Sequence, residues 1–505
     1  MELPYPNLSD SFCCTKIPPC GIISYHLTKN TQEVSSWCDK NLIPSRCSID
    51  DFGITHERIT GRAGLALVSR YLREIGITAL LAKRFWFVKK HTKGTALVSL
   101  FHQILLFFFD GTDFHMTRFD QLKQDAGYAG IIETQADELI SSHAAKRFFG
   151  SFSLVRVWLF RKVLKQLFVW RLKQEQPQII SLGIDTMVLD NDDAHQREGV
   201  EVTYKKVKGF QPLQVFWGRY LIDAVFRNGK AHSNHGNHVQ RVLTDLVKLI
   251  RREYREDVPI IVSADAGFFD EKLFVLCDRL HIGFRIGGKL YEDVKAYAAS
   301  VAKEQLQEFT KGKQTWSYCE FGSRRKTGSH FWRTIYASPH RSDDGQGLFE
   351  FARPDTVIIT NLGMPNTITD MLQQAGEAFR MEAQQVIDSY HLRARDELVN
   401  RGLKDFGTEH LPFKRFASNA AYYYLMTIAF VLFEAFKYDL DTETVPVTWY
   451  AETFRRRCLD IAGKLVRSGG KTLLKLSQAA IDALNFGALW NQSAAVVKIA
   501  PSAGG

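Results

Sequence analysis

The stretch Gln178-Ile-Ile-Ser-Leu-Gly-Ile-Asp185-Thr186-Met-Val-Leu189 is an apolar, β-branched run that ends beside acidic residues. A run of this length and composition, followed by a polar cluster at 190–193, predicts a β-strand. Two more strand-like runs follow at 200–207 and 213–224. The stretch is therefore expected to be the first strand of a sheet, with Asp185 near one end.

The following segments alternate between helix and strand. Residues 237–252 repeat apolar side chains with the helical period, and Pro259-Ile-Ile-Val-Ser-Ala-Asp265 is a buried strand that ends on an aspartate. A helix at 271–280 and a short strand at 283–286 complete the series. Three strands, helix, strand, helix, strand is the order of a ribonuclease H-like α/β fold. Its first and fourth strands are neighbours, so the two aspartates are expected to meet.

A third carboxylate stands in the stretch 390–404, whose spacing is Tyr-x2-Arg-x3-Glu-x6-Lys. The segment is predicted to be one helix. At about 100° per residue, Tyr390, Arg393, Glu397 and Lys404 then share one narrow face. A carboxylate flanked by two cations is suited to holding a divalent metal while phosphates are neutralised, which points to phosphodiester chemistry. The alternative is an ordinary solvated face.

The same Tyr-Arg-Glu-Lys spacing marks bacterial insertion-sequence transposases with a DDE active site, and the chain resembles that group. Asp265-Ala-Gly-Phe resembles the family's Asp-Ser-Gly-Phe, and Lys208-Gly-Phe-Gln-Pro-Leu213 resembles its Gly-Tyr-x-Pro-Leu hairpin. The resemblance implies that Asp185, Asp265 and Glu397 are the catalytic carboxylates. One departure is that Thr186 follows Asp185 directly, without a second Asp before the Thr. Asp190 is the less favoured alternative for the first carboxylate.

The resemblance also implies cofactors and DNA contacts. The three carboxylates would bind two Mg²⁺ ions, with Mn²⁺ as a possible substitute, because hard oxygen ligands suit these ions. Arg393 would hold a phosphate by a bidentate fork and Lys404 by a point charge. Tyr390 would hydrogen-bond a phosphate beside them.

Residues 290–375 are predicted to be a β-rich domain inserted into the catalytic core, which runs over 176–289 and 376–437. Related transposases stack a flipped base on a Trp of this domain, and Trp316 and Trp332 lie in suitable segments. The alternative is that both rings belong to a hydrophobic core.

The chain before the core is predicted to be helical and aromatic over 56–175. A short helix capped by Ser141 or Ser142 would present Lys146 and Arg147, as in a helix-turn-helix type DNA-binding region. A helical packing domain without groove contact is the alternative. Residues 1–55 contain five of the eight cysteines in spacings that match no paired zinc motif, and are predicted to be a poorly ordered leader.

Composition agrees with an anionic partner. The 505 residues carry a formal net charge of +10, with a pI near 9.0. The segment 438–505 is basic, and seven Lys or Arg between 455 and 475 face one acid. The apolar windows 97–109 and 420–433 are too short for membrane spans and predict buried helices, with no secretory signal at the N-terminus.

Together these features predict a cut-and-paste DNA transposase that acts as a homodimer on terminal inverted repeats and target DNA, in the cytoplasm at the bacterial nucleoid. No membrane partner is expected. A metal-dependent nuclease of the same fold and a degenerate DNA-binding protein remain the alternatives.

Overall fold

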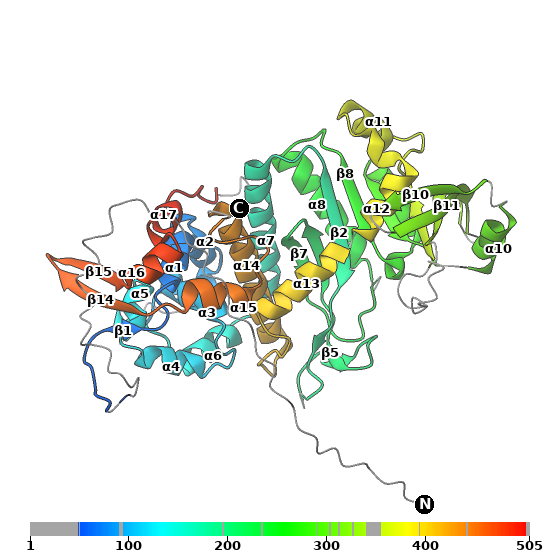
Figure 1. The fold of residues 1–505 in the computed structure, drawn as a ribbon. Coiled ribbons are helices and arrows are strands. Elements are labelled where there is room, and N and C mark those ends of the chain that lie inside the picture. Colours follow the sequence, from blue (N-terminus) through cyan, green and yellow to red (C-terminus); the bar gives the residue numbers. More distant parts are fainter. Residues whose placement is uncertain are drawn as a thin grey trace, which may run out of the picture. The chain divides into compact units, whose positions relative to one another are not determined.

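Nine strands form the sheet that carries both predicted aspartates in the computed structural model of the chain (Figure 1). The structure describes residues 49, 51–89, 94–193, 196–233, 236–289, 291–301, 305–311, 314–325, 328–339, 355–392, 394–440 and 443–500. The predicted leader and its five cysteines lie outside these residues, except for 49 and 51–55. Residues 57–505 form one unit by their internal contacts.

The sheet has the strand order β10-β11-β12-β13-β9-β8-β2-β6-β7. Its strands are β2 (Ile180–Thr186), β6 (Leu213–Trp217), β7 (Tyr220–Val225), β8 (Ile260–Ala264), β9 (Gly283–Gly287), β10 (Gln307–Lys311), β11 (Gln314–Ser323), β12 (Trp332–Pro339) and β13 (Thr356–Thr360). The strands β2, β8 and β9 are parallel neighbours, and all other pairs are antiparallel. All residues of β8 and β9 are buried, as expected for parallel strands covered on both faces. The first and fourth predicted strands, β2 and β8, are therefore neighbours as predicted.

The second and third predicted strands differ from the expectation. Residues 213–224, predicted as a single run, form the hairpin β6–β7, which turns at Gly218 with a φ of 57°. Glycine adopts this left-handed conformation without strain, so the chain reverses inside an otherwise apolar run. Only 201–202 of the predicted run 200–207 are a strand, β4 (Glu201–Val202). It belongs to a separate small sheet with β3 (Leu189–Asp190) and β5 (Lys208–Phe210), in the order β3-β5-β4.

The segment predicted as a β-rich insertion supplies β10 to β13. These strands extend the core sheet, because β13 pairs with β9 through Ile358 opposite Gly287 and Thr360 opposite Arg285. The segment also contains α10 (Glu292–Ser300) and α11 (Thr367–Gln374). Through β13 the segment is thus hydrogen-bonded to the core sheet.

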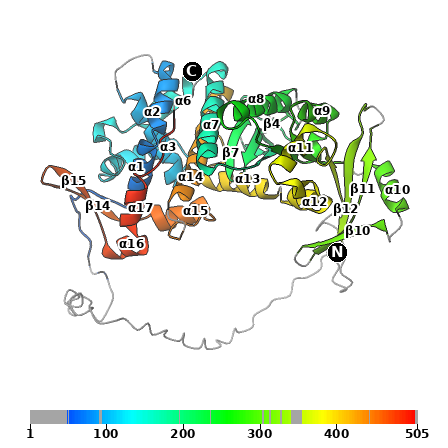
Figure 2. The ribbon, with the colours of Figure 1, turned by 90° about the horizontal axis from the view of Figure 1, so that it is seen from above.

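Helices cover both faces of the core sheet. Figure 2 shows α8 (His238–Glu253) and α9 (Glu271–Arg279) on one side and α13 (Ala394–Phe406) on the other. The helix α12 (Ala383–His391) precedes α13 and packs against β9 and β12. This arrangement brings a helix from the last third of the chain to the strand that carries Asp185.

The chain before the sheet is a cluster of helices, as the apolar periodicity predicted. The helices are α1 (Leu65–Glu74), α2 (Ile77–Arg84), α3 (Leu97–Asp110), α4 (Arg118–Gln124), α5 (Tyr128–Ile131), α6 (Ser142–Gly150) and α7 (Leu154–Glu175). The helix α14 (Phe416–Asp439) packs against α3, α7 and β7. By length and composition α14 is long enough to cross a membrane, contrary to the expectation from its apolar window, but 94% of that window is buried inside the protein.

The basic C-terminal segment packs onto this helical region. It contains α15 (Ala451–Phe454), β14 (Gly463–Ser468), β15 (Lys471–Leu476), α16 (Gln478–Ala483) and α17 (Phe486–Gln492). The hairpin β14–β15 forms a three-stranded sheet with β1 (Ile59–Thr60). Ile499 N donates to Ile75 O, and Trp170 Nε1 donates to Val497 O at 3.1 Å. The C-terminal segment is therefore held to β1, to the end of α1 and to α7.

One residue of the predicted basic stripe is a structural anchor. Arg455 is only 8% exposed, and its guanidinium donates to the carbonyls of Phe108 and Phe109 at the end of α3 and of Asp405 and Phe406 at the end of α13. It satisfies helix-terminal carbonyls that have no partner within their own helices. Arg455 is thus unable to track a DNA backbone, and it fixes the end of the helix that carries Glu397.

Candidate active site

The two aspartates lie at the same edge of the sheet. Because β2 and β8 are parallel and Ile184 pairs with Ala264, the next residues, Asp185 and Asp265, are side by side. Asp185 Oδ1 accepts a hydrogen bond from Thr186 N at 2.7 Å, and Asp265 Oδ1 accepts one from Gly267 N at 2.9 Å. Both carboxylates are half-buried, and local backbone donors fix their orientation.

The helix α13 connects the third carboxylate to this pair. Asn400 Nδ2 donates to Asp185 Oδ2 at 3.0 Å. Glu397 lies three residues earlier, which is about one helical turn, so it is on the same side of α13. Its side chain is exposed. One hydrogen bond therefore places the turn that carries Glu397 beside β2.

The pKa of the Tyr204 phenol is sensitive to all three predicted carboxylates. Desolvation of its hydroxyl and then the negative charges of Asp185, Asp265 and Glu397 raise the pKa of Tyr204. The charges of three acidic side chains from distant parts of the chain therefore reach the Tyr204 hydroxyl.

Tyr390 contacts the same sheet edge. Gly287 ends β9 beside Asp265, and a Cβ atom on it would lie 2.4 Å from Tyr390 Oη and 2.8 Å from Ala266 N. Only glycine leaves room for this approach. The hydroxyl of Tyr390 therefore lies against the backbone next to Ala266, the residue that follows the predicted catalytic Asp265.

The segment 390–404 is not the single helix that its spacing predicted. The helix α12 ends at His391 and α13 begins at Ala394, so helical structure is interrupted at Leu392. Tyr390 and Glu397 consequently lie on different helices. Arg393 lies outside the described residues.

Comparison with known proteins identifies the family. A family model described as transposase DDE domain group 1 matches residues 52–494. The chain belongs to this family. Solved structures with similarity include a piggyBac transposase synaptic complex with hairpin DNA, at 10% sequence identity, covering 80% of this chain and 81% of that chain, with a TM-score of 0.37. This likeness is too weak to show a shared fold. No curated protein sequence matches the chain.

DDE transposase domains use divalent metal ions, and the three predicted carboxylates have the ligand chemistry for such ions. Among the described residues, no three His, Cys, Asp or Glu side chains lie close enough to hold a metal ion. The donor set nevertheless has the right chemistry, because Asp185, Asp265 and Glu397 supply the carboxylate oxygens that Mg²⁺ prefers. We infer that these three side chains would hold the ions.

The predicted phosphate-binding lysine of the transposase domain already has a protein partner. Lys404 Nζ forms an ion pair with Glu409 Oε2 at 2.7 Å, and both side chains are about one-third exposed. A phosphate that binds Lys404 must therefore displace the Glu409 carboxylate or share the lysine with it. The contact remains a prediction.

The two tryptophans proposed for base stacking are largely buried. Trp316 is 5% exposed and stacks on Phe309, with ring centroids 5.1 Å apart. Trp332 is 8% exposed and packs edge-on against Phe274 and Phe284. These contacts agree with the alternative that the rings belong to the core, and a role in base stacking requires either ring to leave its present contacts.

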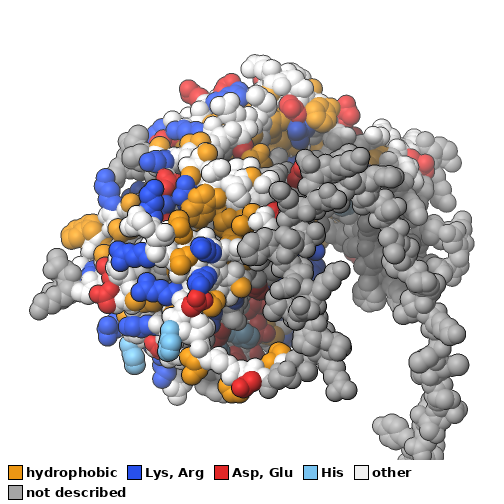
Figure 3. Space-filling model, turned by 60° about the vertical axis from the view of Figure 1, so that its left-hand side comes forward, with side chains coloured by type: hydrophobic (Ala, Val, Ile, Leu, Met, Phe, Trp, Pro, Cys, Tyr) orange, Lys and Arg blue, Asp and Glu red, His pale blue; other side chains and the backbone are white. Residues whose placement is uncertain are grey.

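The two cations predicted to face a DNA groove are exposed. Ser141 Oγ accepts a hydrogen bond from Ala144 N and caps α6, which presents Lys146 and Arg147 to solvent. On the face of the molecule drawn in Figure 3, the coloured residues include more Lys and Arg than Asp and Glu side chains. These two residues are far along the chain from the three carboxylates, and groove binding remains a prediction.

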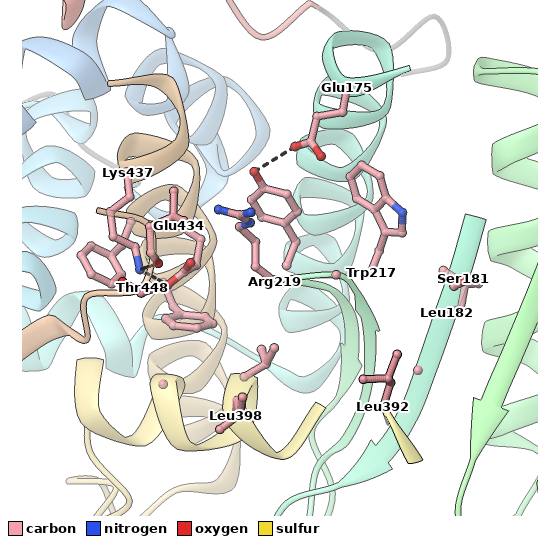
Figure 4. Close-up of a pocket in the computed structure, with 18 of the residues that line it drawn as sticks. Glu175, Ser181, Leu182, Trp217, Arg219, Leu392, Leu398, Glu434, Lys437 and Thr448 are labelled. Carbon is pink, nitrogen blue, oxygen red and sulfur yellow. Dashed lines mark hydrogen bonds and ion pairs between the residues drawn. The ribbon is translucent and has the colours of Figure 1, made fainter. Parts of the chain in front are cut away.

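A cavity of about 830 Å³ lies next to the carboxylates on the same face of the sheet. Gly183, Ser263 and Arg285 line it and pair across β2, β8 and β9, two residues before the edge that carries the aspartates. In Figure 4, Trp217 and Arg219 border the cavity from the β6–β7 turn, and Leu398 borders it from α13. The side of α13 towards the sheet is thus incompletely packed, and Leu398 is 53% exposed.

Sequence reasoning missed Asn400, which donates to a predicted carboxylate, and Tyr204, whose pKa responds to all three. Asn400 follows Glu397 by three positions, so helical spacing alone was sufficient to place it beside Glu397. Tyr204 gave no such signal, because no motif marks the turn between β4 and β5.

Proposed function

We propose that this transposase cuts and joins the ends of a bacterial insertion sequence, with Asp185, Asp265 and Glu397 as its catalytic carboxylates. The observation that carries the proposal is the pairing of β2 and β8, which places two aspartates side by side, together with the bond from Asn400 to Asp185. The order β7-β6-β2-β8-β9 and its strand directions support a ribonuclease H-like core. In such a core the third carboxylate comes from a helix on the face of the sheet. In this proposal that helix is α13, and the carboxylate is Glu397.

The chain's residues hold and orient the reacting groups. Asp185, Asp265 and Glu397 would hold two Mg²⁺ ions, or Mn²⁺ in their place, which would supply the positive charge for activating water or a 3′-hydroxyl and for stabilising the leaving oxygen. Asn400 keeps one oxygen of Asp185 turned towards α13, and the Gly267 amide orients Asp265. Glu397, exposed on α13, would complete the ligand set.

Further residues are proposed to bind DNA. Tyr390 at the sheet edge, Arg393 and Lys404 would contact phosphates beside the carboxylates. Lys146 and Arg147 would contact the terminal inverted repeats, and Trp316 or Trp332 would stack a flipped base. Pairing two element ends requires two active sites, so we also propose a homodimer on DNA, working at the bacterial nucleoid.

A cleavage assay on a DNA element end tests the function. Asp185→Asn, Asp265→Asn and Glu397→Gln keep side-chain shape and remove charge, so each is expected to abolish Mg²⁺-dependent cleavage and to leave end binding intact. Asp190→Asn is the matched control, because Asp190 lies in the small sheet, where its Oδ1 accepts a hydrogen bond from Asp192 N. It is expected to retain most of the activity. Replacing Mg²⁺ by Ca²⁺ is expected to permit binding without cleavage.

Three outcomes would contradict the proposal. Activity in Glu397→Gln rules out this triad. Loss in Asp190→Asn with full activity in Asp185→Asn shows that the first carboxylate is Asp190. Cleavage without joining of the cut end to target DNA assigns a nuclease in place of a transposase.

A further inference from the structure

We propose that the target DNA, into which a cut element end is joined, is bound through its sugar-phosphate backbone in a groove between α8 and α9. This α8–α9 groove has a volume of about 800 Å³. The inference rests on the proposed function and adds to it the surface that holds the second DNA of the reaction. It follows from the place of the groove beside the catalytic edge and from the charges on its walls.

The α8–α9 groove is built from the catalytic core and the inserted segment. Its described walls are the first two turns of α8, the length of α9 and the turn between β11 and β12. Figure 2 shows α8 and α9 side by side on one side of the sheet, with α13 on the other. The helical region that carries Lys146 and Arg147 contributes none of these described walls. The groove is therefore a surface separate from the predicted contact with the inverted repeats.

One end of the groove lies at the edge of the sheet that carries the aspartates. Asp265 follows β8 directly and α9 begins at Glu271, so the first turn of α9 is at this edge. The helix α8 ends at Glu253, shortly before β8 begins, so its first turn also lies towards this edge. In the loop before α8, Ser233 Oγ is 2.9 Å from the place that a Cβ atom on Gly267 would take. The groove therefore extends from the catalytic edge along the two helices.

Positive side chains line the groove along its length. The exposed cations on its walls are Arg241 of α8, Lys272 and Arg279 of α9, and Arg325 of the β11–β12 turn. Among the residues that the structure describes, none of the four has an ion-pair partner. Arg241 and Lys272 are in the first turns of their helices, nearest the catalytic edge. All four charges are thus available to phosphates.

The acidic residues of the groove are already engaged by the protein. Asp270 Oδ1 accepts a hydrogen bond from Lys272 N at 3.1 Å and caps α9. Glu271 Oε1 accepts one at 2.8 Å from a backbone amide of the β11–β12 turn. Asp245 Oδ2 lies 3.4 Å from Lys165 Nζ. These contacts hold the three carboxylates to the protein, so the charge left for a ligand is positive and attracts an anionic backbone.

The turn between β11 and β12 is fixed to the start of α9. Ser329 N and His330 N both donate to Glu271 Oε1, at 2.8 and 3.4 Å. The guanidinium of Arg325 lies over the ring of Phe269, 5.1 Å from its centre. Phe269 belongs to the short segment that joins the catalytic strand β8 to α9. The inserted segment therefore places a cation at the catalytic end of the groove.

A groove with these walls suits target DNA better than the element end. Lys and Arg contacts to phosphates fix the position of a duplex and carry no sequence information. The element end has to be selected by its sequence, which requires contacts to base edges. Target DNA has to be held with a phosphate at the carboxylates, and contacts to its backbone are sufficient for that.

Joining of a pre-cut element end to a plasmid target by the full chain tests the groove. Arg241→Ala with Lys272→Ala removes the two cations nearest the catalytic edge. The target concentration that gives half-maximal joining is expected to rise about 10-fold at physiological salt, because two charge-assisted phosphate contacts are lost. The joining rate at saturating target, the affinity for the element end and the cleavage rate of an end with a short flank are expected to stay as in the wild type.

Two further variants are matched controls. Lys248→Ala with Arg252→Ala removes the same charge from the exposed side of α8 outside the groove and is expected to join like the wild type. Arg241→Lys with Lys272→Arg keeps both charges and is expected to retain most of the joining. Binding of a duplex without element sequence is an independent measurement. The double alanine variant of the groove is expected to lower its slope of log affinity against log salt by about 2.

Three results would overturn the inference. An unchanged half-maximal target concentration in Arg241→Ala with Lys272→Ala excludes the groove as the target site. An equal loss of end cleavage or end binding in this variant assigns the groove to the element end or its flank. An equal loss in Lys248→Ala with Arg252→Ala shows an effect of overall charge.

Failure of the proposed function gives a different pattern. A wild type that cuts and joins no element end refutes the proposed function whatever the groove binds. The salt slope of duplex binding then decides on the groove alone, and an equal slope in the wild type and the double alanine variant excludes it as a DNA site.

Discussion

Asn400 shows how one side chain can set the geometry of a site. It donates to Asp185 from α13, so the position of Glu397 one turn away depends on a hydrogen bond to a strand more than two hundred residues earlier. Residues that orient metal ligands commonly matter almost as much as the ligands themselves. Asn400 therefore belongs to the site although it carries no charge.

Gly287 and Tyr390 provide a prediction at this scale. Gly287→Ala places a methyl group against Tyr390 Oη and Ala266 N, which must shift by several tenths of an ångström or more. We expect the cleavage rate to fall about 100-fold, because small displacements of reacting groups are costly. Adding Tyr390→Phe removes the nearest clashing atom, so the double variant is expected to recover part of the rate. The measurement is single-turnover cleavage with the four proteins of the cycle.

The control for this prediction is Gly322→Ala, where the nearest atom to the new methyl group is 3.8 Å away. It is expected to cleave like the wild type. Identical rates in Gly287→Ala with and without Tyr390→Phe would show that the hydroxyl does not cause the defect.

The sequence allowed the positions of the two aspartates to be predicted, and it did not reveal their surroundings. Asp185 and Asp265 each stand at the end of a hydrophobic run, and parallel pairing of such runs brings their ends together. The surroundings of Tyr204 and the ion pair of Lys404 with Glu409 depend on the conformation of loops. Loop conformation is set by tertiary packing, which periodicity does not encode.

At the scale of elements, sequence patterns gave wrong boundaries where a strand or helix ends inside a continuous apolar or charged run. The run 213–224 contains a two-residue turn between β6 and β7. The turn is hard to predict because the neighbours of Gly218, Trp217 and Arg219, are not typical turn residues. The spacing 390–404 matches a helical face, yet α12 ends within it. The periodicity of apolar residues therefore predicted which segments form strands and helices. It predicted less well where each element begins and ends.

The pairing of α1 with α3 gives a prediction on pH. His102 on α3 lies 3.0 Å from Ser69 Oγ on α1, and its pKa is lowered to about 4, chiefly because burial disfavours the charged ring. The unfolded chain binds this proton near pH 6.5, so stability is present above that pH and is lost on acidification towards pH 4. Between pH 7 and pH 5 the loss from this residue is about 2 kcal/mol.

The free energy of unfolding of the wild type and of His102→Gln, measured at both pH values, checks this expectation. Glutamine does not titrate, so the variant should lose about 2 kcal/mol less than the wild type over the same interval. The same pH dependence in both proteins would show that His102 is not the group responsible.

At the scale of the whole molecule, α14 joins the helical region to the sheet, because it packs against α3 and α7 on one side and β7 on the other. A chain that ends at residue 410 lacks this helix and leaves the apolar sides of α3 and α7 uncovered. We expect it to be largely insoluble and quickly digested by protease. A chain that ends at residue 440 keeps α14 and is the control. Equal protease resistance of the two chains would contradict a central role for α14.

The place of α14 in the sequence also has a consequence for synthesis. The helix α7 ends at residue 175 and α14 begins at residue 416, so the ribosome makes about 240 residues between the two. At typical elongation rates of ~5–20 residues per second, α3 and α7 wait roughly 10 to 50 seconds for their partner. During that interval their phenylalanine-rich surfaces are exposed to other nascent chains. We therefore expect the yield of active transposase in cells to depend on chaperones that bind apolar segments, and to fall when translation slows between these two helices.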